Sequence, residues 1–231
     1  MVFFVTRGLP KKSYNPVFAE NEWSAIIEAC HANEVPDEWV ADGTCYKDML
    51  INGTNYRVDI IGKNHDDLAD GTGKAPLTFQ LHDCYATTYA MNSGNTNSGG
   101  WRDCQMRTQT MPALKALLPE EVQAGIRPVK KLTSAGNKSS SIVTTNDDLF
   151  LLSEIEIFGR TTYSFAGEGK QYAYYKAGNS NVKNRNGSAD GWWERSPYSS
   201  TSTSFCFADS TGNANYSSAG PFVGVAFAFC F

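Results

Sequence analysis

The last nine residues carry the clearest hydrophobic pattern in the chain. The sequence VGVAFAFCF, residues 223–231, places bulky apolar side chains at alternate positions and small side chains between them. Alternation with a period of two is typical of a β-strand. The small side chains would let another layer pack closely on their face. The pattern therefore predicts a core strand held inside a sheet, with one bulky face made of Val223, Val225, Phe227, Phe229 and Phe231.

Two further patterns lie in the first quarter of the chain. Residues 23–30 carry apolar side chains with the spacing i, i+3, i+4, i+7, which predicts a short amphipathic helix. Residues 49–62 contain Asn-Gly at 52–53 between apolar runs, which predicts a hairpin because a type I′ turn needs positive φ at both positions. Residues 1–18 are interpreted as an extended arm or short strand, and residues 63–76 as a loop.

Capping residues in the middle of the chain predict three helices. Asp83 is placed to cap a helix over residues 84–92. A second helix is expected to begin at Cys104, capped by the aspartate before it, and to be interrupted at Pro112. Residues 119–126 begin with proline followed by two acids, which is a typical helix start.

Strand patterns dominate the second half. Residues 149–159 predict a buried strand that runs into a short turn or helix, and residues 205–216 predict a hairpin that turns at 210–213. The order of elements is an early strand, two helical regions, and several strands ending in a core strand. This order predicts an α+β fold with helices on one side of a mainly antiparallel sheet.

Composition narrows the class of protein. The 231 residues are 41% hydrophobic, which suits one large domain or one domain with a small appendage. The net charge of -4 gives no electrostatic reason to expect nucleic acid or an anionic membrane as the main partner. No apolar run reaches the roughly 18 residues that a spanning helix needs, so membrane insertion is not expected. The start of the chain has basic residues after apolar ones, the reverse of a secretory signal, and export is not expected.

The six cysteines, at 30, 45, 84, 104, 206 and 230, show no CxxC spacing, so a structural zinc site is not expected. Without a signal peptide we expect mostly free, buried thiols, with disulfides as the alternative. Cys206 and Cys230 are the pair expected to lie nearest to each other, because both fall in strand-like segments.

The sequence holds no convincing catalytic set. GxSxG, HExxH and P-loop patterns are missing. Residues 64–71 supply several oxygen ligands without calcium-loop spacing, so they are a solvated loop or, alternatively, a site for a hard cation. Residues 164–170 are interpreted as a turn. Glu154 and Glu156 are expected on one face of a strand, in capping or ion-pair roles. We therefore expect no enzyme activity, no metal and no cofactor.

Residues 191–206 join two contrasting pieces. Trp192, Trp193, Glu194 and Arg195 favour a scaffold role, because large aromatic residues usually lie in a core and a buried arginine needs a carboxylate partner. In an extended chain Glu194 and Arg195 point in opposite directions, so their partners lie elsewhere. The runs 198–204 and 209–222 are rich in Tyr, Ser, Asn, Gly and Thr, the composition of antibody-type binding loops. Plain polar loops are the alternative.

Six motifs follow one another in a fixed order. They are GGWRDCQMR (99–107), KLTSAG (131–136), LFLLSEIEIFG (149–159), YSFAGEG (163–169), WWERSP (192–197) and GVAFAFC (224–230). With these motifs the chain, over roughly residues 45–231, resembles an uncharacterised domain found in prophages and in gut Gram-positive bacteria. The C-terminal part of that family resembles the variable proteins of diversity-generating retroelements, in which a mutated cassette rewrites codons near the C-terminus.

The resemblance implies a C-type-lectin-like fold, an antiparallel sheet with two helical regions and long irregular loops. It implies a ligand-binding domain over residues 46–231 and leaves residues 1–45 as an arm or short helix for attachment or oligomerisation. Calcium-dependent sugar binding does not follow, because the expected acidic and asparagine ligands are not evident. The implied display positions, of which Phe222 is bulkier than the rest, are Tyr198, Ser199, Ser200, Ser202, Ser204, Asp209, Ser210, Asn213, Asn215, Tyr216, Ser217, Ser218 and Phe222.

The resemblance also implies partners and a location. Phage examples sit at the tail tip and bind the host surface, so the expected partners are a host cell-surface protein or glycan, phage tail proteins and a second copy of the chain. The expected location is the virion tail, or the bacterial cytoplasm before assembly. Two alternatives stay open. One is a structural virion protein. The other is an enzyme like the formylglycine-generating group, which would use the thiols of Cys206 and Cys230.

Overall fold

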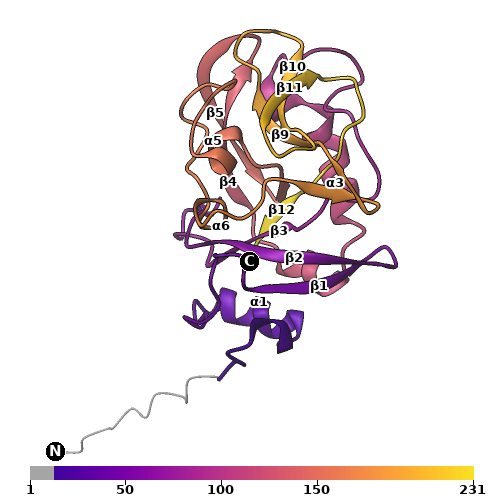
Figure 1. The fold of residues 1–231 in the computed structure, drawn as a ribbon. Coiled ribbons are helices and arrows are strands. Elements are labelled where there is room, and N and C mark those ends of the chain that lie inside the picture. Colours follow the sequence, from indigo (N-terminus) through magenta and orange to yellow (C-terminus); the bar gives the residue numbers. More distant parts are fainter. Residues whose placement is uncertain (1–12) are drawn as a thin grey trace, which may run out of the picture.

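A computed structural model describes residues 13–231, so most of the segment 1–18, predicted as an extended arm, lies outside the described residues. The protein is mixed α+β, with mostly antiparallel sheets and few helices (Figure 1). The largest sheet has five strands in the order β1-β2-β3-β12-β6, and every pairing within it is antiparallel. Its strands are β1 (Tyr46–Ile51), β2 (Thr54–Lys63), β3 (Leu77–Leu81), β6 (Leu149–Phe150) and β12 (Ala228–Cys230).

Three smaller sheets lie on the other side of β3 and β12 from α1 (Figure 1). The three-stranded sheet has the order β11-β10-β9, with β9 (Trp192–Pro197), β10 (Ser204–Ala208) and β11 (Ala214–Ser218). Two hairpins complete the set. They are β4 (Val129–Gly136) with β5 (Ser139–Asp147), and β7 (Lys183–Arg185) with β8 (Ser188–Asp190).

Helices are short and scattered between the strands. A 3₁₀ turn, η1 (Phe18–Glu20), precedes the longest helix, and a π-helical turn (Met106–Thr110) joins two others. None of the helices in residues 13–231 is long and apolar enough to cross a membrane. The α-helices are α1 (Trp23–His31), α2 (Gly100–Asp103), α3 (Met111–Lys115), α4 (Glu120–Gly125), α5 (Glu154–Phe158) and α6 (Ala173–Lys176).

The predictions from short-range patterns are confirmed. The Asn-Gly pair joins β1 to β2 with φ of 47° at Asn52 and 80° at Gly53, as a type I′ turn requires. The amphipathic segment forms α1, and the run 149–159 forms β6 followed by α5. The hairpin predicted over 205–216 is β10 with β11. These elements form where predicted because their signals act between neighbours in sequence.

The helix predicted over residues 84–92 does not form. Its backbone instead pairs with the C-terminal segment, where the N–H of Tyr85 donates to Val225 O at 2.8 Å and the N–H of Tyr89 donates to Val223 O at 3.0 Å. The carboxylate of Asp83, expected to cap the helix, accepts the N–H of Asn184 at 2.7 Å. Long-range pairing therefore replaces the helical hydrogen bonds.

The helix predicted to begin at Cys104 forms one residue later, from Gln105, but Asp103 does not cap it. Asp103 is the last residue of α2, and its carboxylate pairs with the guanidinium of Arg102 at 2.8 Å. Pro112 lies near the start of α3, directly after the π turn Met106–Thr110. The helical conformation continues through it to Lys115, so Pro112 lies where π geometry changes to α geometry and does not end the helix.

The terminal segment is buried more completely than its alternation predicts. Residues 224–231 are all buried, the small side chains as well as the bulky ones, and regular strand is confined to β12. β12 lies between β3 and β6, so the sheet covers both of its edges. The small residues do allow close packing, because a Cβ at Gly224 would lie 2.7 Å from Cys84 Sγ.

Residues before 46 share the core of the rest of the chain. The rings of Phe18 and Trp23 lie 6.2 and 5.9 Å from that of Phe79 on β3, and Trp23 lies 6.1 Å from Phe231. A single hydrophobic cluster therefore joins α1 to the last residue of the chain. The described part of the segment 1–45 is not a separate core, and its role in attachment or oligomerisation stays a prediction.

The prediction of free thiols is confirmed. All six cysteines are free, and five of them are buried. Cys206 lies on β10 and Cys230 on β12, strands of different sheets, so the pair expected to lie nearest to each other is not bonded.

Candidate functional site

Arg195, on the edge strand β9 of the three-stranded sheet, is the centre of a buried ionic network. The side chain is fully buried, and its Nη2 donates to Glu156 Oε1 at 2.8 Å. Glu156 also accepts the N–H of Ser153 at 3.0 Å and completes the capping box of α5. Burial opposes ionisation, but Arg195 and Lys131 hold the pKa of Glu156 below its ordinary value. The carboxylate that a buried arginine was expected to need is therefore Glu156.

Lys131 extends the network to the loop after β2. Its Nζ lies 2.7 Å from Asp66 Oδ1 and 2.8 Å from Glu156 Oε1, and all three side chains are buried. Burial alone would raise the pKa of Asp66, but Lys131 and His65 lower it to about 2. The ring of His65 stacks on Tyr172, with centroids 4.0 Å apart. Cations and carboxylates therefore neutralise each other inside the protein.

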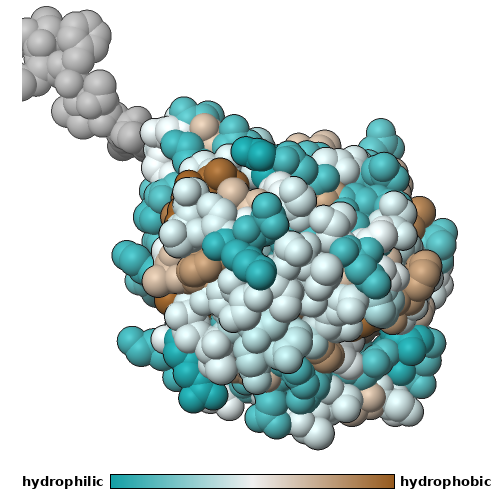
Figure 2. All heavy atoms as spheres, turned by 90° about the horizontal axis from the view of Figure 1, so that it is seen from above, coloured by the Kyte–Doolittle hydropathy of each residue, from teal (hydrophilic) through white to brown (hydrophobic). Residues whose placement is uncertain are grey.

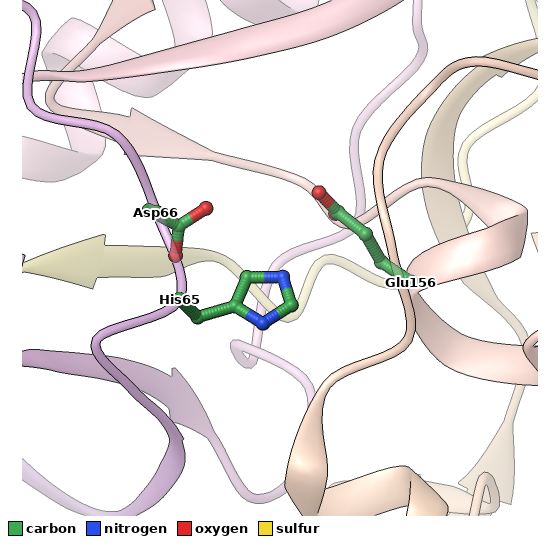
Figure 3. Close-up of side chains that lie close together, drawn as sticks. All are labelled: His65, Asp66 and Glu156. Carbon is green, nitrogen blue, oxygen red and sulfur yellow. The ribbon is translucent and has the colours of Figure 1, made fainter. Parts of the chain in front are cut away.

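His65, Asp66 and Glu156 are close enough together to hold a metal ion. In Figure 3 the loop after β2 and helix α5 bring these side chains toward one another. The ammonium of Lys131 already bonds both carboxylates, however, and supplies the positive charge that a cation would bring. The donor set therefore fits an internal ion pair better than a metal.

The expectation for residues 64–71 is wrong in part, because neither a fully solvated loop nor a single cation site describes them. Asp66 points inward to Lys131, Asp67 pairs with Lys74 at 2.8 Å, and Asp70 pairs with Arg127 at 2.9 Å. The oxygen ligands therefore diverge toward separate lysines and an arginine.

All four residues assigned to the scaffold, Trp192, Trp193, Glu194 and Arg195, are completely buried. Glu194 differs from its neighbour because neither carboxylate oxygen has a hydrogen-bond partner among the described residues. Burial, and secondarily the carboxylates of Glu154 and Glu168, raise the pKa of Glu194 well above its ordinary value. The predicted partner elsewhere in the chain is therefore found for Arg195, while the prediction is wrong for Glu194 among the described residues.

The carboxylates of Glu154 and Glu156 accept hydrogen bonds from main-chain N–H groups. The sequence placed Glu154 and Glu156 on a strand, but both lie on α5, because the serine before them caps a helix. Glu154 Oε2 accepts the N–H groups of Tyr163 and Ser164 at 3.0 and 2.8 Å. Its role is to order the loop that follows α5.

Residues 164–170 form the predicted turn, with φ of 99° at Gly167 and 131° at Gly169. The residue between these glycines, Glu168, points inward and was missed by sequence analysis. It accepts the N–H of Ser134 at 2.8 Å and the hydroxyl of Ser196, and burial raises its pKa to about 7. The flanking glycines were the available signal, since they free the backbone to turn the side chain inward.

The predicted display positions fall mostly on one loop and one hairpin. Most are exposed or half-buried, and Phe222 and Tyr216 are 72% and 42% exposed. The prediction is wrong for Ser204, which is 5% exposed and whose carbonyl accepts a hydrogen bond from the buried side chain of Asn97. Ser204 begins β10, where the pairing with β9 and β11 covers both edges of the strand.

Three tyrosines meet at this surface. The rings of Tyr198 and Tyr216 stack with centroids 4.0 Å apart, and the ring of Tyr163 lies 5.7 and 5.2 Å from them. We call these residues the tyrosine trio. Tyr163 was missed because it comes from the loop after α5, far from the display runs in sequence. The trio joins three separate segments into one partly exposed aromatic group.

The chain segments that carry the display positions hold little charge. Asp209 is the only charged residue between Ser196 and the end of the chain. Its carboxylate accepts the N–H and hydroxyl of Thr211 at 2.9 and 2.6 Å, which lowers its pKa and ties it to its own turn. Figure 2, a view onto the end of the molecule that carries β10 and β11, shows a broad pale area of intermediate hydropathy broken by teal residues.

Comparison with known proteins identifies the family. No curated protein and no solved structure matches the chain. Residues 78–229 match the family described as "Domain of unknown function (DUF6273)". The match runs from β3 to β12 and includes the ionic network residues Lys131, Glu156 and Arg195, together with the tyrosine trio. The chain therefore belongs to the DUF6273 family.

Proposed function

We propose that the protein is a ligand-binding module whose binding surface consists of the loop 198–204, the hairpin of β10 and β11, and Tyr163. The observation that carries the proposal is the tyrosine trio beside display segments that contain a single charged residue, Asp209. Tyrosine provides a large contact area at a small cost in side-chain entropy, and the surrounding serine and asparagine side chains adapt their hydrogen bonds. Such a surface suits recognition without chemistry.

A buried strand lies next to this surface. β9 is buried along its whole length and pairs with β10 in the same sheet, while Arg195 and Glu194 lie inside the protein. Binding surfaces are commonly built from exposed loops on a rigid scaffold. The contrast between a buried strand and exposed loops next to it in sequence supports the proposal.

We further propose that the protein is phage-derived and of the diversity-generating retroelement type, with a C-type-lectin-like fold. Supporting the fold, an early strand, β3, pairs with the final strand β12, and a second small sheet lies beside them. The proposed ligand is a host cell-surface protein or glycan, with phage tail proteins and a second copy as further partners. The proposed location is the phage tail, or the bacterial cytoplasm before assembly.

The alternative of a thiol enzyme has less support. Burial raises the pKa of both Cys206 and Cys230 well above the ordinary value, and a thiol is reactive as its thiolate. The alternative of a purely structural virion protein predicts no binding to bacterial cells, so a cell-binding experiment separates it from the present proposal.

The direct test is binding of the fluorescently labelled protein to a panel of Gram-positive gut bacteria. We expect saturable binding to at least one strain, and loss of roughly tenfold or more in affinity for Tyr216→Ala, as for an aromatic hot spot. Tyr46→Ala is the matched control, because Tyr46 is 43% exposed but lies on β1. Equal binding by the two variants, or none by the wild type, contradicts the proposal.

The variable character is tested by sequencing codons 186–231 of the gene in many copies from one microbial community. Changes at adenines that cluster in codons 198–222, and that spare Trp192, Trp193 and Ser204, are expected. A display region as uniform as the frame rejects diversification and leaves a binder of fixed specificity.

A further inference from the structure

We infer that Asn97 is the positioning residue of the proposed binding surface. Its side chain holds the main chain of the loop 198–204, so the loop keeps one path whatever side chains it displays. The inference rests on the proposed function for its biological meaning, but the geometry that carries it does not depend on any ligand.

Asn97 bonds the loop through main-chain carbonyls alone. The residue is completely buried, and its Nδ2 donates to the carbonyls of Ser204 at 2.7 Å and Thr201 at 2.9 Å, with that of Tyr198 at 3.4 Å. Its own N–H donates to Ser202 O at 2.8 Å. One asparagine therefore satisfies carbonyls from the beginning, middle and end of the loop, and no display side chain takes part.

The orientation of the amide group is itself determined by its surroundings. Asn97 Oδ1 accepts the N–H of Asn137 at 2.8 Å, and its backbone carbonyl accepts the N–H of Gly100 at 3.0 Å. Rotating the amide by half a turn would place an oxygen against the loop carbonyls and an NH₂ group against an N–H donor. The hydrogen bonds therefore allow one orientation.

Two motif glycines make room for this arrangement. At Gly136, where φ is +72°, a Cβ would lie 1.7 Å from Asn97 O. At Gly100, where φ is +59°, a Cβ would lie 2.2 Å from Ser134 O. The glycines of GGWRDCQMR and KLTSAG thus let the segments on both sides of Asn97 approach each other closely. The sequence alone assigned no structural role to either motif.

The other hydrogen bonds between this loop and neighbouring segments also run through the main chain. The N–H of Ser199 donates to Tyr163 O at 2.8 Å, and the N–H of Ala219 donates to Thr203 O at 2.9 Å. Within the described chain, the hydroxyls of Ser199, Ser200 and Ser202 take part in no hydrogen bond. A loop held in this way can exchange these side chains at little cost in stability.

The first test is Asn97→Asp, which keeps the size and the acceptor but removes both donors. We expect hydrogen exchange of the amides of Tyr198 and Ser199 to accelerate roughly tenfold or more, as the loss of buried hydrogen bonds implies. The matched control is Asn179→Asp, because Asn179 Nδ2 likewise donates to two carbonyls, Asp42 O and Tyr174 O, at a distant place. Unchanged exchange in the loop, or equal acceleration by the control, overturns the inference.

The second test keeps Asn97 and changes the display side chains, so it applies even if the aspartate variant does not fold. The triple variant Ser199→Asn, Ser200→Tyr, Ser202→Asn is expected to shift the melting temperature by no more than about 3 °C, as for surface changes. Exchange of the loop amides should stay at the wild-type rate. A larger loss of stability, or faster exchange, overturns the inference. Neither test uses a ligand, so failure of the cell-binding experiment leaves this result standing.

Discussion

Replacing Glu194 is expected to stabilise the protein. Its carboxylate lies completely inside the fold on β9, and neither oxygen has a hydrogen-bond partner among the described residues. Glu154, Glu168 and Arg195 act electrostatically on this carboxylate, which in turn acts on Tyr175 and on Cys206 of the neighbouring strand. Methionine at position 194 removes the polar group while keeping a similar volume, and glutamine removes only the titration.

The size of the effect has two parts. An unpaired buried polar group costs about 1–3 kcal/mol, which methionine recovers at any pH. The second part depends on pH. Burial raises the folded pKa of Glu194 above its ordinary value of 4.5, so the folded state binds the proton more tightly than the unfolded state. The stability contribution is complete below pH 4.5 and is lost as the pH rises toward the folded pKa, at about 1.4 kcal/mol per pH unit.

The assay is urea unfolding followed by far-UV circular dichroism at pH 5, 6 and 7. Glu194→Gln should flatten the decline in unfolding free energy over this range, and Glu194→Met should in addition lie above wild type at every pH. Glu38→Gln, at an exposed position, is the control and should run parallel to wild type. Parallel curves for wild type and Glu194→Gln, or a methionine variant less stable than wild type at pH 7, would refute the reasoning.

Three further substitutions test the frame. Lys131→Met leaves two buried carboxylates facing each other, so it should lower the free energy of unfolding, measured in urea, by about 3 kcal/mol. Lys130→Met, at an exposed position, should lower it by less than about 0.5 kcal/mol. Gly136→Ala should lower the melting temperature far more than Gly187→Ala, because both have positive φ but only the first would clash; equal losses would contradict this. Burial raises the folded pKa of Glu168 to about 7, so the wild type should lose roughly 3 kcal/mol of unfolding free energy as the pH rises from 4.5 to about 7. Glu168→Gln should remove this loss, and an unchanged pH profile of the melting temperature would count against it.

Local chemistry made several elements predictable. The hairpin at Asn52-Gly53 follows from positive φ, α1 follows from its apolar spacing, and the hairpin of β10 and β11 follows from a polar turn between apolar runs. The composition of residues 198–204 also predicted an exposed loop beside a buried strand, and only Ser204 at its end proved to be buried. In each case the forces act within a few residues, so the sequence contains the whole signal.

The candidate site depended on contacts that span most of the chain. Residues 84–92 lost their helix to hydrogen bonds with residues 219–225, and Tyr163 joined two tyrosines of a different segment. No local pattern encodes which distant backbone or ring will be present.

The sequence by itself therefore determined which side chains are large, charged or small, the turns and short helices these favour, and the need of Arg195 for a buried partner. Only the tertiary structure decided that Glu156 is this partner, that Glu194 has none, and that Asn97 holds the display loop. The physical reason is that burial sets the strength of a charge or hydrogen bond, and burial is a property of the packed chain.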